Sequence, residues 1–183
     1  MRVITGTARG KKLASPEGEH TRPTLERIKE AIFSIIQFDI ANKDVLDLFA
    51  GSGQLGIEAL SRGAKYAEFV DNDKNACDVI TSNLKSTDLS NKAKVICGEC
   101  FSHVRHKRDC EKYGLIFIDA PYGKDLADDM LKNIAANDIC GEDAIIVCEC
   151  ARADKYKDSY GEFVLYRNKE YASTRILVYK KGG

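Results

Sequence analysis

Short runs of apolar residues alternate with amphipathic segments along most of the chain. Five runs rich in β-branched and aromatic residues predict buried strands at 45–49, 67–70, 93–97, 115–118 and 144–148. Near-continuous apolar runs of this length are typical of strands that are covered on both faces. The segments between them are long enough for helices, and repeated strand–helix units indicate a parallel sheet with right-handed crossovers.

Helix signals flank these strands. The segment 54–62 ends at Gly63, and glycine commonly ends a helix. From Lys74 onward, apolar residues recur at helical spacing behind Asp73, a residue type that caps helix N-termini. Another apolar stripe predicts an N-terminal helix over 23–38.

The C-terminal part departs from this alternation. Strand-like runs at 162–167 and 174–180 are joined by six residues, which leave no room for a helix. They predict an antiparallel hairpin that closes one edge of the sheet. We therefore expect a single α/β domain over 1–183, with a doubly wound, mostly parallel seven-stranded sheet and a C-terminal antiparallel hairpin.

Composition limits the classes of protein that remain. Of the 183 residues, 44% are hydrophobic and 31% are charged, which is enough apolar material for one buried core. No apolar stretch approaches the roughly 20 residues that span a membrane, and the N-terminus lacks the apolar segment of a secretory signal. The sequence thus predicts a cytoplasmic protein with no membrane contact.

Basic residues are concentrated at the N-terminus although the whole chain is neutral. Lys+Arg and Asp+Glu number 28 each, so nucleic-acid binding would need a local patch rather than an overall field. The first 14 residues contain no acid and four cations, Arg2, Arg9, Lys11 and Lys12. We expect 1–22 to form a basic hairpin extension, although charge alone is equally compatible with a solvated edge.

The cysteines predict free thiols. Seven is an odd number in a chain large enough to need no disulfide, so a reducing compartment is expected. Four candidate metal ligands follow one another at three-residue intervals: Cys97, Cys100, His103 and His106. Structural zinc sites separate their two ligand pairs by about a dozen residues or more. Buried thiols and exposed imidazoles are therefore the better interpretation, and no metal is expected.

A glycine loop joins the first predicted strand to the next helix. Gly51, Gly53 and Gly56 have a spacing that allows a tight turn, close backbone approach to a ligand and close helix–strand contact. Asp71 ends the following strand, where its carboxylate can accept hydrogen bonds from two ribose hydroxyls. Together they predict a nucleoside-type cofactor, against the alternative of a purely structural turn.

Two further features narrow the choice of cofactor. A phosphate-binding loop needs Lys and Ser or Thr after its last glycine, where this chain has Ile57 and Glu58. The chain also leaves no space for the separate substrate domain that nicotinamide enzymes usually bring. Asp47, an acid inside an apolar strand, suits the cationic amino group of a methionine moiety. These features favour S-adenosylmethionine, although Asp47 could instead accept hydrogen bonds from backbone amides.

The fourth strand leads into an Asp-x-Pro-Tyr sequence. In a doubly wound sheet the carboxyl ends of central strands line the ligand crevice, so Asp119 should face the cavity of the glycine loop. Asp119 and the carbonyl of Ala120 can accept the two hydrogens of an exocyclic base amine. Pro121 fixes the backbone direction, and Tyr122 offers a ring for base stacking. The alternative is a turn in which Asp119 caps the backbone and Tyr122 merely packs.

At these residues the chain resembles the bacterial 16S ribosomal RNA guanine-N2 methyltransferases of the RsmD type, over nearly its whole length. Besides the Asp-x-Pro-Tyr corner, the segments that carry the resemblance are 1–6, 9–13, 21–24 with Arg27, Glu30 and Phe33, 47–53, 55–56 and 58–64. The N-terminal segments separate this family from other adenosylmethionine enzymes. The family commonly has Pro in place of Ala120 and Asp in place of Glu99, so the contacts of these two residues are less certain.

The resemblance implies a Rossmann-like class I methyltransferase fold and methyl transfer from S-adenosylmethionine to the N2 amine of a guanine in 16S rRNA. S-adenosylhomocysteine would be the product, the assembling small subunit the substrate, and no obligate protein partner is expected. The implied catalytic residues are Asp119, Ala120, Pro121 and Tyr122. The implied cofactor contacts are Thr24, Asp47, Phe49, Gly51, Gly53, Gly56, Asp71, Asn72 and Glu99. The implied RNA contacts are Arg2, Arg9, Lys11, Lys12 and Arg22.

Two other functions stay open at this point. Adenine-N6 and cytosine-N4 enzymes share the Asp-x-Pro-Tyr pattern, so the target amine could belong to DNA or to another RNA. A non-catalytic assembly factor that binds S-adenosylmethionine is the third alternative, but it has no use for that pattern.

Overall fold

The computed structural model describes residues 1–16, 23–107, 112–121 and 125–182, with only the backbone for 23–25. Its helices are α1 (Pro23–Ile35), α2 (Gln54–Ser61), α3 (Lys74–Thr87), α4 (Cys100–His106) and α5 (Leu126–Ala136), with a 3-10 turn at Ser90–Lys92. Its strands are β1 (Asp44–Leu48), β2 (Tyr66–Asp71), β3 (Ala93–Cys97), β4 (Tyr113–Ile118), β5 (Cys140–Ala151), β6 (Ser159–Tyr160), β7 (Phe163–Glu170) and β8 (Thr174–Lys181).

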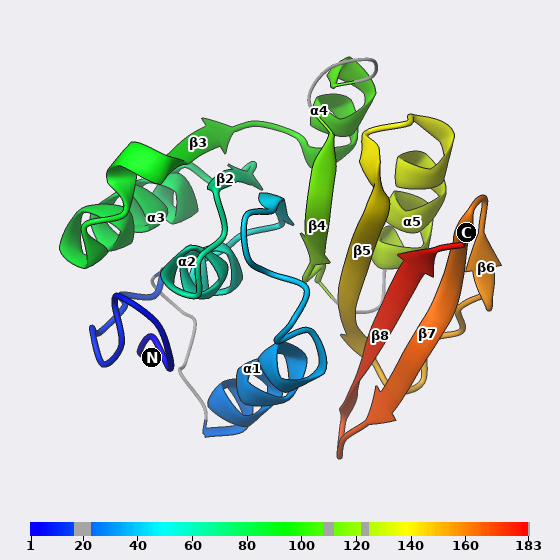
Figure 1. Ribbon diagram of the computed structural model, residues 1–183, viewed down its shortest axis with the longest axis horizontal. Coiled ribbons are helices and arrows are strands. Elements are labelled where there is room, and N and C mark those ends of the chain that lie inside the picture. The colour runs from blue at the N-terminus through cyan, green and yellow to red at the C-terminus, as the bar shows by residue number, and fades with distance from the viewer. Residues whose placement is uncertain (17–22, 108–111, 122–124, 183) are drawn as a thin grey trace.

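The eight described strands form one sheet in the order β3-β2-β1-β4-β5-β8-β7-β6 (Figure 1). The first five run parallel, and β8 lies antiparallel between β5 and β7. The expected doubly wound sheet with a C-terminal hairpin is confirmed. It has one strand more than the seven expected, because the two-residue β6 pairs with the start of β7. Two residues are too few to show the period-two pattern that marks a strand in a sequence.

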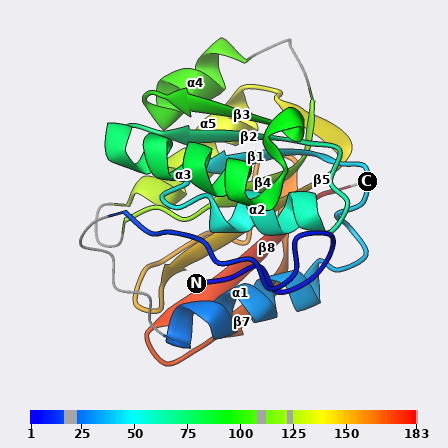
Figure 2. The ribbon, with the colours of Figure 1, turned by 90° about the vertical axis from the view of Figure 1, so that its left-hand side faces the viewer.

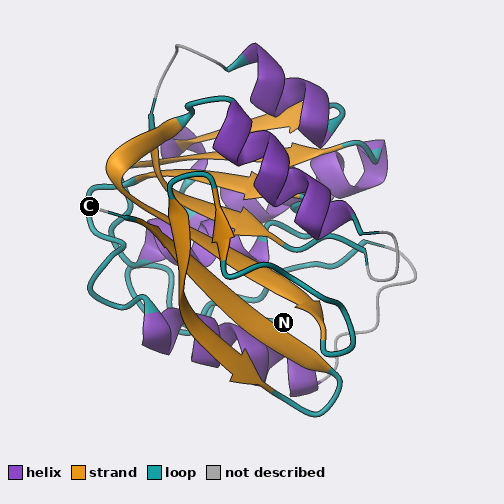
Figure 3. Ribbon diagram, turned by 90° about the vertical axis from the view of Figure 1, so that its right-hand side faces the viewer, coloured by secondary structure: helices purple, strands orange, loops and turns teal. Residues whose placement is uncertain are grey.

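Helices cover both faces of the parallel part of the sheet, which explains its continuous apolar runs (Figures 2 and 3). Phe117 of β4 enters the core shared with α1, where its ring lies 5.7 Å from that of Phe33. Its neighbours Ile116 and Ile118 enter the second core, which includes Met130 of α5. Both faces of a strand such as β4 must therefore be apolar.

The N-terminal helix is shorter than the 23–38 expected from its apolar stripe. Helix α1 ends at Ile35, and the chain then turns toward β1. Ile36 and Ile40 remain buried after the helix has ended, whereas Phe38 is 92% exposed. The buried side chains continue the apolar pattern through a turn, and this is why the pattern overestimates the helix.

A buried carboxylate holds the N-terminal segment against the fold. Glu58 of α2 is fully buried, and it accepts hydrogen bonds from the backbone amides of Ile4 at 2.7 Å and Thr5 at 2.9 Å. Arg62 donates to it at 2.8 Å, and the ammonium of buried Lys29 lies 3.5 Å away. A charge this deep is tolerated only with such partners. The segment therefore lies on α2 instead of extending as a free arm.

Two polar side chains fix the same segment farther along. Ser61 of α2 accepts a hydrogen bond from the amide of Ala8 at 3.0 Å. Asn83 of α3 accepts from the amide of Ala14 at 2.8 Å and donates to the carbonyl of Ser52 at 2.9 Å. Asn83 therefore ties the N-terminal segment to the turn that follows β1.

Replacing Glu58 by Gln should lower the free energy of unfolding by about 3–5 kcal/mol, because the buried ammonium of Lys29 would lose the carboxylate that lies 3.5 Å from it. Hydrogen exchange at the amides of Ile4 and Thr5 should accelerate. Asp78→Asn removes an exposed ion pair with Lys74 and is the control, with an expected change below about 1 kcal/mol. Equal, small effects of the two substitutions in urea unfolding would contradict the proposed anchoring.

Candidate active site

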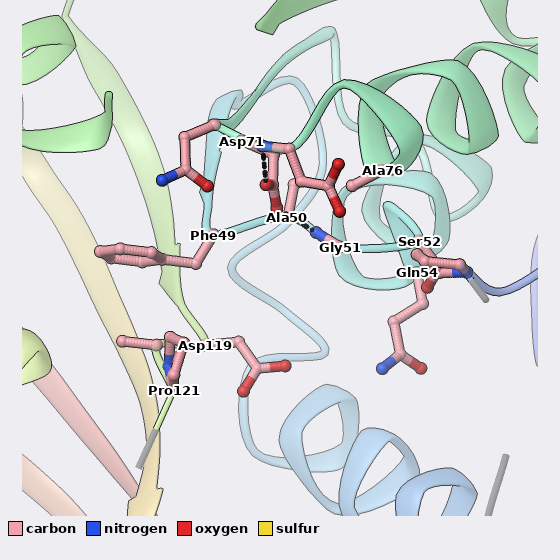
Figure 4. A pocket seen from close by; sticks show the side chains of 13 residues that line it. Phe49, Ala50, Gly51, Ser52, Gln54, Asp71, Ala76, Asp119 and Pro121 are labelled. Atoms are coloured by element: carbon pink, nitrogen blue, oxygen red, sulfur yellow. Dashed lines mark hydrogen bonds between the residues drawn. The ribbon is translucent and has the colours of Figure 1, made fainter. Parts of the chain in front are cut away.

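A cavity of about 440 Å³ lies at the carboxyl ends of β1, β2 and β4 (Figure 4). The strand order reverses between β1 and β4, and doubly wound folds bind ligands at this point of the sheet. The volume of the cavity is in the range of about 300–1,000 Å³ that is usual for small-molecule sites. The lining residues are Pro16, Phe49, Ala50, Gly51, Ser52, Gln54, Asp71, Asn72, Asp73, Ala76, Asp119, Ala120 and Pro121.

The turn between β1 and α2 needs its glycines. Gly51 and Gly53 have φ values of 54° and 74°, in the left-handed region that side chains rarely adopt. At Gly56 an added Cβ would lie 2.4 Å from a ring atom of Phe69, so only glycine lets α2 approach β2 this closely. Gly51 lines the cavity, whereas Gly53 and Gly56 shape the turn from behind it.

Asp71 connects this turn to the next strand. One carboxylate oxygen accepts a hydrogen bond from the amide of Gly51 at 2.8 Å, and the other accepts from Asp73 at 2.9 Å. Each oxygen has a second lone pair, and the carboxylate lines the cavity beside Phe49 and Asn72. The predicted ribose contact would use these remaining lone pairs.

Asp119 stands on the opposite wall of the cavity. Its amide approaches the carbonyl of Leu48 at 3.5 Å, which places it beside the end of β1. Its side chain extends into the space below Gly51 and Asp71 (Figure 4). Ala120 and Pro121 continue this wall. Tyr122, the remaining residue of the corner, lies outside the described residues.

Asp47 lies behind the turn and is not part of the cavity lining. It is 1% exposed, and its carboxylate accepts a hydrogen bond from the amide of Gly56 at 2.8 Å. Burial raises the pKa of Asp47 to about 7, although the Gly56 hydrogen bond opposes this shift. Its described contact is therefore the backbone interaction that the sequence left open as an alternative to a methionine contact.

Glu99, another expected cofactor residue, also lies apart from the cavity lining. Glu99 is the N-cap of α4, where its carboxylate accepts hydrogen bonds from the amides of Phe101 at 2.9 Å and Ser102 at 2.6 Å. Thr24 lies in α1, and its side chain is outside the described part of the structure.

The basic N-terminal residues differ in their surroundings. Arg2, Arg9 and Lys12 are exposed, and an isolated antiparallel bridge joins Arg2 to Lys12. Lys11 forms an ion pair with Asp88 at 2.6 Å, so part of its charge is already neutralised. Arg22 lies outside the described residues.

The cysteine and histidine series does not converge on one point. Cys97 is exposed and Cys100 is buried, and His106 bonds to Ser102 within α4. Over 1–16, 23–107, 112–121 and 125–182 we find no group of three or more side chains that could hold a metal ion.

His103 is largely buried, against the expected exposed imidazole, because it contacts Glu68 in the sheet at 3.2 Å. Glu68 is 2% exposed, and burial alone would raise its pKa. Hydrogen bonds from His103, Lys107 and Tyr113 outweigh burial and lower the pKa of Glu68 to about 2. This cluster stabilises the packing of α4 on the sheet, and its members are far apart in the sequence.

Sequence reasoning missed several residues of the cavity. Ser52 and Gln54 alternate with the glycines of the turn, so their position in the glycine motif could have indicated that they line the cavity. Pro16 had no such signal, because it reaches the cavity only through the docking of the N-terminal segment by Asn83. No helix in the described ranges is long and apolar enough to cross a membrane.

The sheet order and the position of the cavity define the Rossmann-like fold of class I methyltransferases. The chain matches the family described as "Conserved hypothetical protein 95" over residues 1–180. The chain therefore belongs to this family, the RsmD family, and the resemblance noted in the sequence is confirmed.

Relatives and solved structures agree with this membership. YlbH of Bacillus subtilis, named as a candidate rRNA methyltransferase, is 39% identical over 185 residues and 100% of both chains. Ribosomal RNA small subunit methyltransferase D of Haemophilus influenzae is 33% identical over 81% of this chain and 78% of its own. The structure of yhhF, a candidate methyltransferase of Escherichia coli, matches with a TM-score of 0.86 and 27% identity, and covers 100% of this chain and 98% of that one.

The raised pKa of Asp47 predicts a pH-dependent stability. Because about 7 lies above the ordinary 3.8, the contribution of Asp47 is complete below about pH 4 and is lost as the pH rises toward 7. Asp47→Asn keeps an acceptor for Gly56 but cannot ionise. Unfolding in urea from pH 4 to 8 should show the wild type losing stability relative to this variant, by at most about 4 kcal/mol. If the stability difference between the two proteins stayed constant over this pH range, the pKa of Asp47 would not be raised in the folded protein.

Proposed function

We propose that the protein is an S-adenosylmethionine-dependent methyltransferase that modifies the exocyclic N2 amine of a guanine in 16S rRNA of the small ribosomal subunit. The observation that supports this best is one cavity lined by the glycine turn, by Asp71 and by Asp119. Membership of the RsmD family supports the same activity, since the Haemophilus influenzae relative is named for the small-subunit rRNA.

The residues of the cavity fit the cofactor. S-adenosylmethionine, when bound, supplies an electrophilic methyl group. Asp71 would accept hydrogen bonds from its ribose hydroxyls, and the turn at Gly51 allows backbone to approach it closely. Phe49 and Asn72 flank this end of the cavity. The pairing of Asp71 with the amide of Gly51 holds the carboxylate and the turn in a fixed relation before a ligand enters.

Asp119 would activate the target amine. The lone pair of an exocyclic base amine is delocalised into the ring, so the amine is a poor nucleophile. The Asp119 carboxylate and the Ala120 carbonyl can accept its two hydrogens and direct the lone pair toward the methyl group. Asp119 would also stabilise the positive charge that develops on this nitrogen as it takes up the methyl group. The surplus proton leaves through the same carboxylate to solvent.

The N-terminal segment would bring the RNA to this cavity. Arg9 and Lys12 are exposed on it, and Pro16 of the same segment lines the cavity. Exposed cations contact phosphates without reading sequence. Double-stranded RNA presents few readable base edges to side chains, so the target guanine should be unpaired or extruded from its helix.

Asp119→Asn tests the catalytic role. The amide cannot carry the negative charge, so turnover should fall by at least about 100-fold, whereas S-adenosylmethionine affinity should stay within severalfold of the wild type. Asp129→Asn, at an exposed position of α5, is the control and should leave both unchanged. Wild-type turnover in Asp119→Asn would remove the proposed role.

The substrate is tested with tritiated S-adenosylmethionine and small subunits from a strain that lacks this methylation. The proposed function predicts label in 16S rRNA and N2-methylguanosine after nuclease digestion and mass analysis. Label in another methylated nucleoside, or in DNA, would refute the guanine-N2 specificity. Cofactor binding without any label in the subunits would refute the enzymatic proposal and favour the assembly factor.

A further inference from the structure

The exposed large hydrophobic side chains gather at one place on the molecule. Among the described residues there are three, with Phe38 92%, Val164 51% and Tyr166 43% exposed. Val164 is paired with Lys180 across β7 and β8, and the ammonium of Lys180 lies 4.4 Å from the centre of the Tyr166 ring. Lys180 also contacts Asp39, the neighbour of Phe38, at 3.5 Å. Single exposed apolar residues are common on proteins, so it is their grouping around one cation that indicates an interaction surface.

A β-bulge in β7 adds a second cation to this surface. The pairing of β7 with β8 shifts between Leu165 and Arg167, which leaves Tyr166 as the extra residue. At such a bulge two residues oppose one on the partner strand, and the direction of their side chains changes. The guanidinium of Arg167 lies 3.9 Å from the centre of the Tyr166 ring, and it donates hydrogen bonds to the carbonyl of Tyr166 at 2.9 Å and to its hydroxyl at 3.1 Å. The bulge therefore brings an aromatic ring and two cations together.

Arg167 and Lys169 lie on the same face of the sheet. Across the ladder they oppose Val178 and Ile176, which belong to the core shared with α1. From Tyr166 onward, however, β7 is exposed to the end of the strand. This part of β7 is therefore an open surface that α1 does not cover.

The charge of this surface is not cancelled by acids. Arg167 and Lys169 form no ion pair with any described residue, whereas the neighbouring acid Glu170 pairs with Arg152 at 3.0 Å. A cation–π contact attracts a cation through the ring quadrupole, and a ring without net charge does not neutralise it. The ring of Tyr166 thus orients Arg167 and leaves its charge available to a ligand.

We propose that this surface is a second RNA contact, separate from the N-terminal segment, and the proposal rests on the proposed function. We call it the β7 patch, and its residues are Phe38, Val164, Tyr166, Arg167, Lys169 and Lys180. Guanidinium and ammonium groups contact phosphates, and aromatic rings and guanidinium planes stack on unpaired bases. A single-stranded segment of the rRNA near the target guanine supplies both kinds of partner.

The position of the β7 patch suits an RNA that is bound at the cavity. β7 is three strands away from β4 in the sheet, which is about 14 Å at the usual spacing of strands. β7 also runs in the same direction as β5, so its Lys169 end lies toward the edge of the sheet that carries the cavity. The N-terminal segment lies on the other side of α1 (Figure 1). Two separated contacts fix the orientation of an RNA, which a single contact does not.

The salt dependence of RNA binding tests the charged part of the β7 patch. The probes are protein-free 16S rRNA and small subunits, both from a strain that lacks this methylation. Arg167→Gln combined with Lys169→Gln should weaken binding to both probes by about tenfold at low salt. The slope of log affinity against log salt should fall by about 1.4, since each phosphate contact to a single strand contributes about 0.7. Lys92→Gln combined with Lys94→Gln removes two exposed cations at the opposite edge of the sheet. This matched control should bind like the wild type.

Phe38 tests the stacking part without a change in charge. Phe38→Ala should weaken binding to both probes by about fivefold or more, since the stacking of a base on the ring is lost, and should leave the salt slope unchanged. Phe38→Trp should restore the affinity of the wild type. Because the side chain is 92% exposed, neither substitution should change the melting temperature. All these variants should bind S-adenosylmethionine like the wild type, which reports that the cavity is intact.

Two results would overturn the inference while the proposed function stands, provided that the wild type still transfers methyl groups to the rRNA. If the variants of the β7 patch bound protein-free 16S rRNA like the lysine control, the patch would not contact RNA. If their binding were weakened with intact subunits alone, the patch would contact a protein of the subunit. If the wild-type protein bound neither probe and transferred no methyl group, the proposed function would fail together with the inference.

Discussion

Two carboxylates accept hydrogen bonds from backbone amides at the two ends of the turn between β1 and α2. Asp71 accepts from Gly51 at the front, and Asp47 accepts from Gly56 behind it. The positive φ values of Gly51 and Gly53 allow the backbone to adopt this turn. The hydrogen bonds to the two carboxylates hold it in one conformation. The lining of the cavity depends on this turn, because Gly51 and Gln54 face the ligand space only while the turn is held this way.

A second set of buried polar groups extends the cavity wall to the N-terminal segment. Glu58 and Asn83 act at two points of that segment, and the result is that Pro16 reaches the cavity while Arg9 and Lys12 stay exposed. The N-terminal segment, which is the proposed RNA contact, is therefore also part of the wall of the proposed cofactor cavity. A change in the segment can alter the cavity without touching any residue that contacts the cofactor.

Local sequence patterns predicted the parallel sheet, the C-terminal hairpin and the glycine turn, because each depends on neighbours along the chain. They could not predict the roles of Glu58, Glu68 or Asn83. The partners of these residues are distant in sequence, and only the folded chain shows that a buried charge has found its donors. Asp47 shows the same limit: its place in an apolar strand favours a ligand contact but leaves a backbone contact open, and only the folded chain shows its hydrogen bond with the amide of Gly56.

The central claim is that the glycine turn, Asp71 and Asp119 form the walls of one ligand site. Hydrogen exchange measured with and without S-adenosylhomocysteine tests it most directly. We expect slower exchange together in the segments that contain Gly51, Asp71 and Asp119, with the β7–β8 hairpin unchanged. Protection at the turn without protection at Asp119, or protection only elsewhere in the chain, would contradict the account.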